Sequence, residues 1–319
     1  MAEFTWSHYV FVVVSLITAP LYISILIIYV REWKRNVDQK TTLMLLISQG
    51  IADLVCSLNY FCFVSMRATK WLTPIYWNLQ NYYIATWCFN QYYIATVLRT
   101  LGITLITTHR YMTMCQHGSV WERCSNSNYR WILVIVQWVF PFVYVMPALG
   151  RKLLFFDNEH GMNVVAGHDL ITIGNVLAVG FLCPSFTVCL LCYMAILRFL
   201  YKHRLDNTIS FKRELRVCVQ MIGMVVAFAL CTLYHVLLFK FSLSADLLLI
   251  FKTRQQYPLM TCFLSYISPW MMVVTSKDLR AKLLNFYNIR LDRHSPSPQL
   301  SRFREISNSK ITPICISRR

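Results

Sequence analysis

The chain consists of long apolar runs separated by short polar segments. Seven of these runs have a length close to or above the ~20 residues that a helix needs to cross ~30 Å of hydrocarbon. We expect helices, because a helix satisfies its backbone hydrogen bonds internally and a lone strand in lipid does not. The pattern predicts an all-α membrane protein, a seven-transmembrane helix bundle with spans at 9–30, 41–66, 80–112, 131–149, 171–200, 217–241 and 257–276.

The composition supports this prediction. Hydrophobic residues make up 56% of the 319 positions and charged residues only 14%, well below the ~25% charged residues of soluble domains. The net charge of +17 does not indicate a nucleic-acid partner, because the charges lie between the apolar runs and in the last 43 residues. The 12 cysteines show no metal-binding spacing and most lie inside the spans. We therefore expect no metal and no other cofactor.

Basic residues are distributed unequally between the two sets of loops. The loops after spans one, three and five, together with the tail, hold 23 of the 31 Lys and Arg, whereas the opposite side holds seven. Positively charged loops stay in the cytosol. We therefore expect an extracellular N-terminus (1–8), a seven-transmembrane domain (9–276) and a cytosolic C-terminal tail.

The beginning of the tail is amphipathic. Leu279, Leu283 and Tyr287 share one helical face, and neighbouring Arg and Lys side chains can meet lipid headgroups. This pattern predicts a membrane-surface helix over 277–290. A solvated helical extension is the alternative. Beyond it, Ser, Pro and scattered Arg predict a disordered cytosolic segment over 291–319.

Two charged side chains fall in the middle of spans, Asp53 in the second and Arg99 in the third. An intramembrane charge costs at least ~2.5–3.5 kcal/mol on insertion scales, so it normally faces the bundle and pairs. At about 1.5 Å per residue both lie roughly 16–18 Å from the cytosolic end. Their depths predict an intramembrane ion pair. The alternative is two separately hydrated residues in an internal cavity.

Several short stretches, taken together and in order, resemble a known family. They are SQGIAD (48–53), YYIA (82–85), CFN (88–90), LRTLG (98–102), HRYMTMCQ (109–116) and LSYISP (264–269). With these residues the chain resembles the G-protein-coupled receptors. More narrowly, over residues 9–290, it resembles the nematode serpentine chemoreceptors of class V, within the class G superfamily.

The resemblance implies a conformational switch operated by a ligand. A small odorant or pheromone-like molecule binds from outside, and the cytosolic ends of spans three, five and six open to a heterotrimeric G protein. Arg110, in the tripeptide His109-Arg110-Tyr111, would contact that partner. Pro269 would kink span seven and Pro184 would break span five, by removing a helix hydrogen bond; alternatively, each is only a tolerated kink. The resemblance also implies the plasma membrane of sensory neurons.

The chain departs from the family pattern at several places. The loop 150–170 has no Cys, so the common disulfide to span three cannot form, and span six lacks its usual proline. His109 stands where related receptors carry an acid, so Arg110 lacks its usual neighbouring counter-charge. We expect Glu214, near the inner end of span six, to clasp Arg110 in an inactive state. The alternative is a local pair of Glu214 with neighbouring Lys or Arg on a wet surface.

A ligand pocket is expected to open outward between spans three, five, six and seven, with aromatic side chains and a few polar groups. The candidate residues are Trp87, Gln91, Tyr92, Thr96, Tyr234 and His235. None of them is a carboxylate, so an amine ligand would have no obvious counter-ion. An aromatic packing layer near the headgroups is the alternative interpretation.

Two other classes of membrane protein are compatible with seven spans. A transporter or channel can use intramembrane charges such as Asp53 and Arg99 as an ion path, but no inverted repeat is evident. A membrane enzyme needs a catalytic motif, and the chain contains no H-E-x-x-H, no G-x-S-x-G and no paired intramembrane aspartates. The sequence therefore favours a receptor that is not an enzyme.

Overall fold

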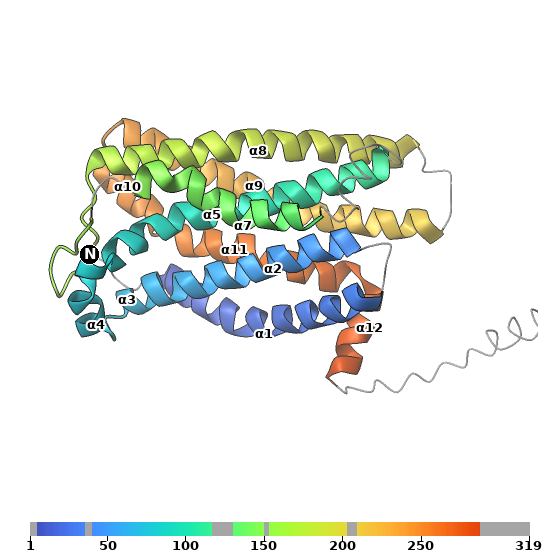
Figure 1. Cartoon of the computed structure of the whole chain (residues 1–319), viewed down its shortest axis with the longest axis horizontal. Coiled ribbons are helices and arrows are strands. Elements are labelled where there is room, and N and C mark those ends of the chain that lie inside the picture. Colours follow the sequence, from blue (N-terminus) through green and yellow to red (C-terminus); the bar gives the residue numbers. More distant parts are fainter. Residues whose placement is uncertain (1–4, 36–39, 117–129, 150–152, 203–208, 288–319) are drawn as a thin grey trace, which may run out of the picture. The chain divides into compact units, whose positions relative to one another are not determined.

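Helices make up most of the chain that the structure describes. The structure is a computed structural model, which describes residues 5–35, 40–116, 130–149, 153–202 and 209–287. The long helices are α1 (Trp6–Arg35), α2 (Lys40–Tyr60), α5 (Ile84–Cys115), α7 (Arg130–Leu149), α8 (His168–Lys202), α9 (Ile209–Leu243) and α11 (Tyr257–Thr275) (Figure 1). The shorter segments are η1 (Phe61–Ser65), α3 (Met66–Ala68), α4 (Thr73–Asn78), η2 (Gln80–Tyr82), α10 (Leu247–Arg254) and α12 (Lys277–Phe286).

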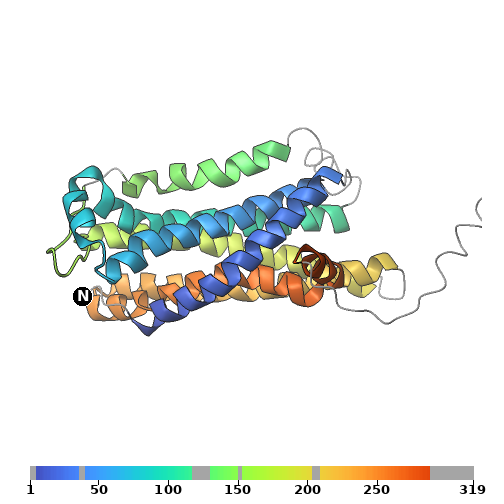
Figure 2. The ribbon, with the colours of Figure 1, turned by 90° about the horizontal axis from the view of Figure 1, so that it is seen from below.

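The seven long helices form the predicted bundle. They lie within one unit, residues 1–283, while residues 284–319 form a second unit. Six of the helices make a closed ring in which each packs against the next, in the order α1, α2, α5, α8, α9, α11 and back to α1. The remaining helix, α7, packs against α2, α5 and α8 and lies along one side of the bundle (Figure 2).

The third span, α5, is the most polar of the seven and lies inside the bundle. Six helical stretches in the described part of the chain are long and apolar enough to cross a membrane on their own composition, and α5 is not among them. The reason is its position, because α5 packs against α2, α7, α8 and α9 and so meets little lipid. Its polar side chains, including Asn90, Gln91, Arg99 and Thr100, are buried between helices. A central helix can therefore carry polar groups that a lipid-facing helix cannot.

The helix boundaries differ from the predicted spans at particular residues. The second span ends in the π-helical turn η1 and the short helix α3, and the third begins only at Ile84. Tyr83, directly before it, has a left-handed backbone with φ of 70°. The expected break at Pro184 is wrong, because α8 runs unbroken through this residue. Pro269 lies inside α11, and the kink expected there remains a prediction.

The predicted helix after the last span is present as α12, which ends at Phe286 rather than at residue 290. Leu279 and Leu283 are buried in a cluster with side chains of α1 and α11. Lys282 forms an ion pair with Glu32 of α1. The amphipathic pattern is thus used for packing at this end of the bundle. The predicted disorder of 291–319 lies outside the described residues.

Candidate functional site

Asp53 and Arg99 are both buried, with exposed fractions of 1% and 2%, but they have different partners. The Asp53 carboxylate accepts hydrogen bonds from Tyr22 Oη at 3.1 Å and from Gln49 Nε2 at 3.1 Å. Arg99 Nη1 donates to Ser265 Oγ at 3.0 Å and to a backbone carbonyl of α11 at 3.3 Å. The predicted direct pair is therefore not formed. Neutral groups on neighbouring helices hold each charge instead.

Asp53 is one end of a buried hydrogen-bond chain that joins α2 to α7. Gln137 Nε2 of α7 donates to Gln49 Oε1 at 3.0 Å. Gln137 Oε1 accepts from Ser48 Oγ at 2.7 Å, and Trp138 Nε1 donates to the same Ser48 Oγ at 3.1 Å. A buried polar group is tolerated when it is hydrogen-bonded. The chain of amides and hydroxyls therefore accounts for Asp53 at membrane depth without a counter-ion in direct contact.

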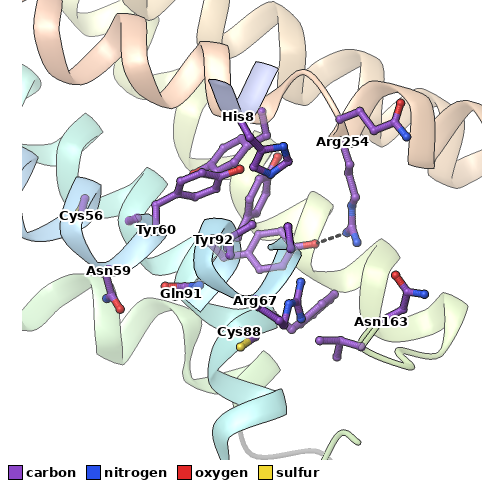
Figure 3. A pocket seen from close by; sticks show the side chains of 18 of the residues that line it. His8, Cys56, Asn59, Tyr60, Arg67, Cys88, Gln91, Tyr92, Asn163 and Arg254 are labelled. Carbon is purple, nitrogen blue, oxygen red and sulfur yellow. Dashed lines mark hydrogen bonds between the residues drawn. The ribbon is translucent and has the colours of Figure 1, made fainter. Parts of the chain in front are cut away.

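A cavity of about 270 Å³, seen from close by in Figure 3, lies at the end of the bundle where α1 begins, and His8 of α1 lines it. Residues from α1, the end of α2, α3, α5, α10, the start of α11 and the loop before α8 line it. By the orientation that the basic residues predict, this is the extracellular end. Aromatic rings form much of its wall, namely Tyr60, Phe89, Tyr92, Tyr93 and Tyr257. Such a wall with a few polar groups is typical of a small-molecule site.

A π-helical turn positions the residues that form one side of the cavity. The turn η1 follows α2 directly and precedes Arg67. A π-helical turn contains an extra residue, so it shifts the register of the side chains that follow it, and such turns are frequent at functional sites. Val64, Arg67 and Ala68, in and just after this turn, all line the cavity.

The loop between α7 and α8 covers the cavity without a disulfide. Phe156 and Met162 are buried, at 5% and 1% exposure, in a cluster with side chains of α4 and α5. The backbone N–H of Leu154 donates to Thr86 Oγ1 of α5 at 2.9 Å. Phe156 also forms an antiparallel bridge with Val164, a lining residue. All cysteines in the described part of the chain are free, so packing and hydrogen bonds hold this loop.

A carboxylate closes the turn at the tip of this loop. Asp157 Oδ1 accepts from the backbone N–H groups of Asn158 at 2.7 Å and Asn163 at 2.8 Å, and Oδ2 accepts from Asn163 Nδ2 at 3.0 Å. Burial raises the pKa of Asp157, but these hydrogen bonds outweigh it and hold the pKa below its usual value. The charged carboxylate therefore orders the turn that carries Asn163 to the cavity.

Two of the six predicted pocket residues, Gln91 and Tyr92, line the cavity. Trp87 lies behind it, where its Nε1 donates to Oδ1 of the lining residue Asn59 at 3.2 Å. The sequence therefore located the α5 side of the cavity and missed the opposite wall.

The other three predicted residues lie further into the bundle, in contact with the cavity's aromatic wall. Thr96 Oγ1 lies 3.4 Å from His235 Nε2. The His235 ring lies 5.4 Å from the ring of Tyr92, and the Tyr234 ring lies 6.0 Å from that of Tyr257. These three side chains support the wall and do not line the cavity.

The cavity residues that were not predicted from the sequence lie mainly at or near the ends of helices. They include His8 of α1, Arg67 of α3, Arg254 of α10 and Tyr257 of α11. In the sequence, both arginines stood out only as members of the small set of basic residues on the side predicted to be extracellular. No spacing along the chain connects them, because they come together through the packing of α2 and α11. Among the described residues, no group of three or more His, Cys, Asp or Glu side chains could hold a metal ion.

The predicted switch residues lie at the opposite end of α5. His109 is buried, and its Nδ1 lies 3.5 Å from Thr42 Oγ1 of α2. Tyr111 Oη accepts a hydrogen bond from Gln116 Nε2 at 3.3 Å, and Arg110 is partly buried. The side chain of Glu214 lies outside the described residues, so the clasp with Arg110 remains a prediction.

Comparison with known proteins gives one family. The family of serpentine type seven-transmembrane G-protein-coupled chemoreceptors Srv matches residues 11–289, a stretch that runs from α1 into the segment after α12. The match confirms the resemblance drawn from the sequence. It is a family of receptors and not of enzymes. No protein with curated annotation matches the chain.

Proposed function

Because the chain belongs to the serpentine seven-transmembrane chemoreceptors of the Srv family, we propose that it binds a small molecule from outside and activates a heterotrimeric G protein. The observation that supports this proposal is the cavity of about 270 Å³ at the end of the bundle that the basic residues predict to be extracellular. By its family we also propose that the receptor works in the plasma membrane of sensory neurons.

A single rigid element connects the two ends of the proposed switch. Between its outer end and its middle α5 contributes Gln91, Tyr92 and Arg99 to the cavity, and its inner end carries Arg110. With 32 residues and about 1.5 Å of rise per residue, this helix extends over about 48 Å. A ligand shifts a conformational equilibrium by its differential affinity for the two states. Contacts with α5 in the cavity are suited to this role.

The inner end of the bundle is closed by packing. Tyr111 and Met114 of α5 pack against a buried cluster formed by α8 and α9, which includes Tyr193, Ile196 and Met221. A partner protein that inserts between these three helices would have to separate this cluster. We therefore propose that ligand binding favours an arrangement in which it opens. An Arg110–Glu214 clasp would add to the closed state, so Glu214→Ala is expected to raise signalling without ligand at matched surface expression.

The alternative function, a transporter or channel that uses Asp53 and Arg99, has less support. Asp53 does not line the cavity, and its carboxylate is hydrogen-bonded to Tyr22 and Gln49. A membrane path for ions requires groups that exchange partners with the ion. Here Asp53 is buried between helices and does not face the cavity.

The experiment that tests the proposal is a ligand screen on the full-length receptor in a heterologous cell, with G-protein dissociation as the readout. Ala95 lines the cavity, so Ala95→Phe is expected to abolish the response by filling it. The matched control is Val139→Phe on the exposed side of α7, where the residue is 52% exposed. Arg110→Ala is expected to remove signalling while ligand binding remains. A response that survives Ala95→Phe, or ligand-driven solute flux without G-protein activation, would contradict the proposal.

A further inference from the structure

The charge of the cavity wall is entirely positive. Arg67, Arg99 and Arg254 line it, and none of its lining residues is Asp or Glu. The ion pair between Lys282 and Glu32 lies at the other end of the bundle. A buried guanidinium normally requires a paired anion, because desolvation of an unpaired charge is costly. No carboxylate in the described part of the protein forms a direct ion pair with any of the three arginines.

Arg254 is positioned by aromatic groups. Its Nη2 donates to Tyr93 Oη at 3.2 Å, as drawn in Figure 3. The guanidinium carbon lies 5.6 Å from the centre of the Phe89 ring, within the range of a cation–π contact. Its Nε is buried and has no hydrogen-bond partner among the described residues. The Arg254 side chain is thus held in position, and its Nε–H remains available to a ligand.

Arg67 repeats this arrangement from another wall. Its guanidinium carbon lies 5.7 Å from the centre of the Phe156 ring, in the loop that covers the cavity. Its Nε and Nη1 are buried and make no hydrogen bond to a described residue. Figure 3 shows the Arg67 and Arg254 side chains both reaching into the cavity. Two guanidinium groups with unused donors therefore face one cavity.

Deeper groups extend the same pattern. Gln91 is 5% exposed, lines the cavity, and its Nε2 donor has no partner among the described residues. Arg99, 2% exposed, also retains an unpaired Nε although its Nη1 is bonded to α11. Unused nitrogen donors thus come from several elements around one cavity. Native proteins leave few buried donors unpaired, and each such group requires an explanation.

We infer that the cavity binds a small organic anion, a carboxylate or a chemically similar oxyanion, whose charge is held by Arg67 and Arg254. This inference rests on the proposed function, because it takes the cavity as the ligand site of the receptor. A guanidinium offers planar paired donors that match the oxygens of a carboxylate or sulfate. The apolar part of the ligand lies against the rings of Tyr60, Tyr92 and Tyr257.

The test measures binding without a G protein. The full-length receptor is placed in nanodiscs of phosphatidylcholine alone, which keeps anionic lipid headgroups away from the two arginines. The probes are straight-chain, branched and aromatic monocarboxylates, each compared with its methyl ester, alcohol and amine, and with the corresponding alkyl sulfate. Thermal unfolding of the receptor reports binding, because a ligand that binds only the folded state raises the melting temperature. We expect at least one carboxylate or sulfate to raise it and the matched neutral and cationic analogues not to do so.

Four variants locate the site. Arg67→Gln and Arg254→Gln are each expected to weaken binding of the active anion about tenfold to a hundredfold, the effect of losing a charged hydrogen bond. Lys252→Gln is the control, because it removes the same charge from the same helix, α10, at an exposed position that does not line the cavity. Arg254→Lys keeps the charge and is expected to recover part of the affinity.

Each result decides the inference separately from the proposed function. A neutral or amine ligand that binds better than every anion, or an active anion that binds both Gln variants as tightly as the wild type, overturns it while leaving a receptor function intact. Loss of the anion effect when phosphatidylglycerol is added to the nanodiscs assigns the arginines to lipid headgroups and also overturns it. Arginine-dependent anion binding without any G-protein activation in cells upholds it and contradicts the proposed function instead.

Discussion

The helix α7 depends on a narrow contact with the rest of the bundle, and Gln137 lies in the middle of it. Among the described side chains of α7, those buried from solvent and lipid are Gln137, Pro141 and Val145. They are spaced four residues apart and so form one stripe along the helix. Both ends of the Gln137 amide are bonded to α2. We predict that Gln137→Leu, which is similar in size but cannot hydrogen-bond, weakens the attachment of α7.

The magnitude follows from the two bonds that are lost. The bond from Ser48 Oγ to Gln137 Oε1 is lost. Ser48 still accepts from Trp138, and its hydroxyl can donate to a backbone carbonyl instead. The loss of this bond therefore costs about 0.6 kcal/mol, the average for interhelical hydrogen bonds in a membrane. Gln49 Oε1 is left without a donor in a buried position, which costs about 1–3 kcal/mol. The expected loss is therefore about 1.6–3.6 kcal/mol. For a chain of 319 residues this corresponds to a fall in melting temperature of about 2–5 °C.

The assay is thermal unfolding of purified receptor with a thiol-reactive fluorogenic dye. Cys56, Cys189 and Cys231 are buried and free, so they react as the bundle opens. The control is Val136→Ala on the lipid-facing side of the same helix, where the side chain is 39% exposed. Gln49→Leu and the double change complete a cycle, in which the second substitution is expected to cost less than the first. A melting temperature of Gln137→Leu equal to that of the control would refute the argument.

Three further predictions follow from the orientation, the buried charges and the covering loop. An epitope tag before Phe4 is expected to bind antibody on intact cells and one after Ile316 only after permeabilisation; the reverse labelling would contradict the orientation. Asp53→Leu and Arg99→Leu are each expected to reduce surface expression, and the double change should not restore it, because the two charges have separate partners; recovery would show a direct pair. Reduction with dithiothreitol is expected to leave the melting temperature and ligand response unchanged, since the loop over the cavity contains no Cys; loss of either would reveal a covalent link.

The departures from expectation concern contacts between helices. The sequence predicted Asp53 and Arg99 at similar depths within their spans, and both are buried. Depth, however, does not fix the rotation of a helix about its axis. Rotation determines that Asp53 meets Tyr22 and Gln49, while Arg99 meets α11. The cavity was missed in part for the same reason. Its wall joins Arg67 and Arg254, which are separated along the chain by several helices.

The sequence by itself was enough to identify the spans and the receptor family, and it predicts the orientation in the membrane. These properties are local, because lipid acts on each span separately through its length and apolarity, and the positive loops act through their own charge. Only the tertiary structure decided which polar groups meet: the chain from Asp53 to Gln137, the covering loop without a disulfide, and the arginines around one cavity. Such contacts depend on the order and rotation of packed helices, which no single segment encodes.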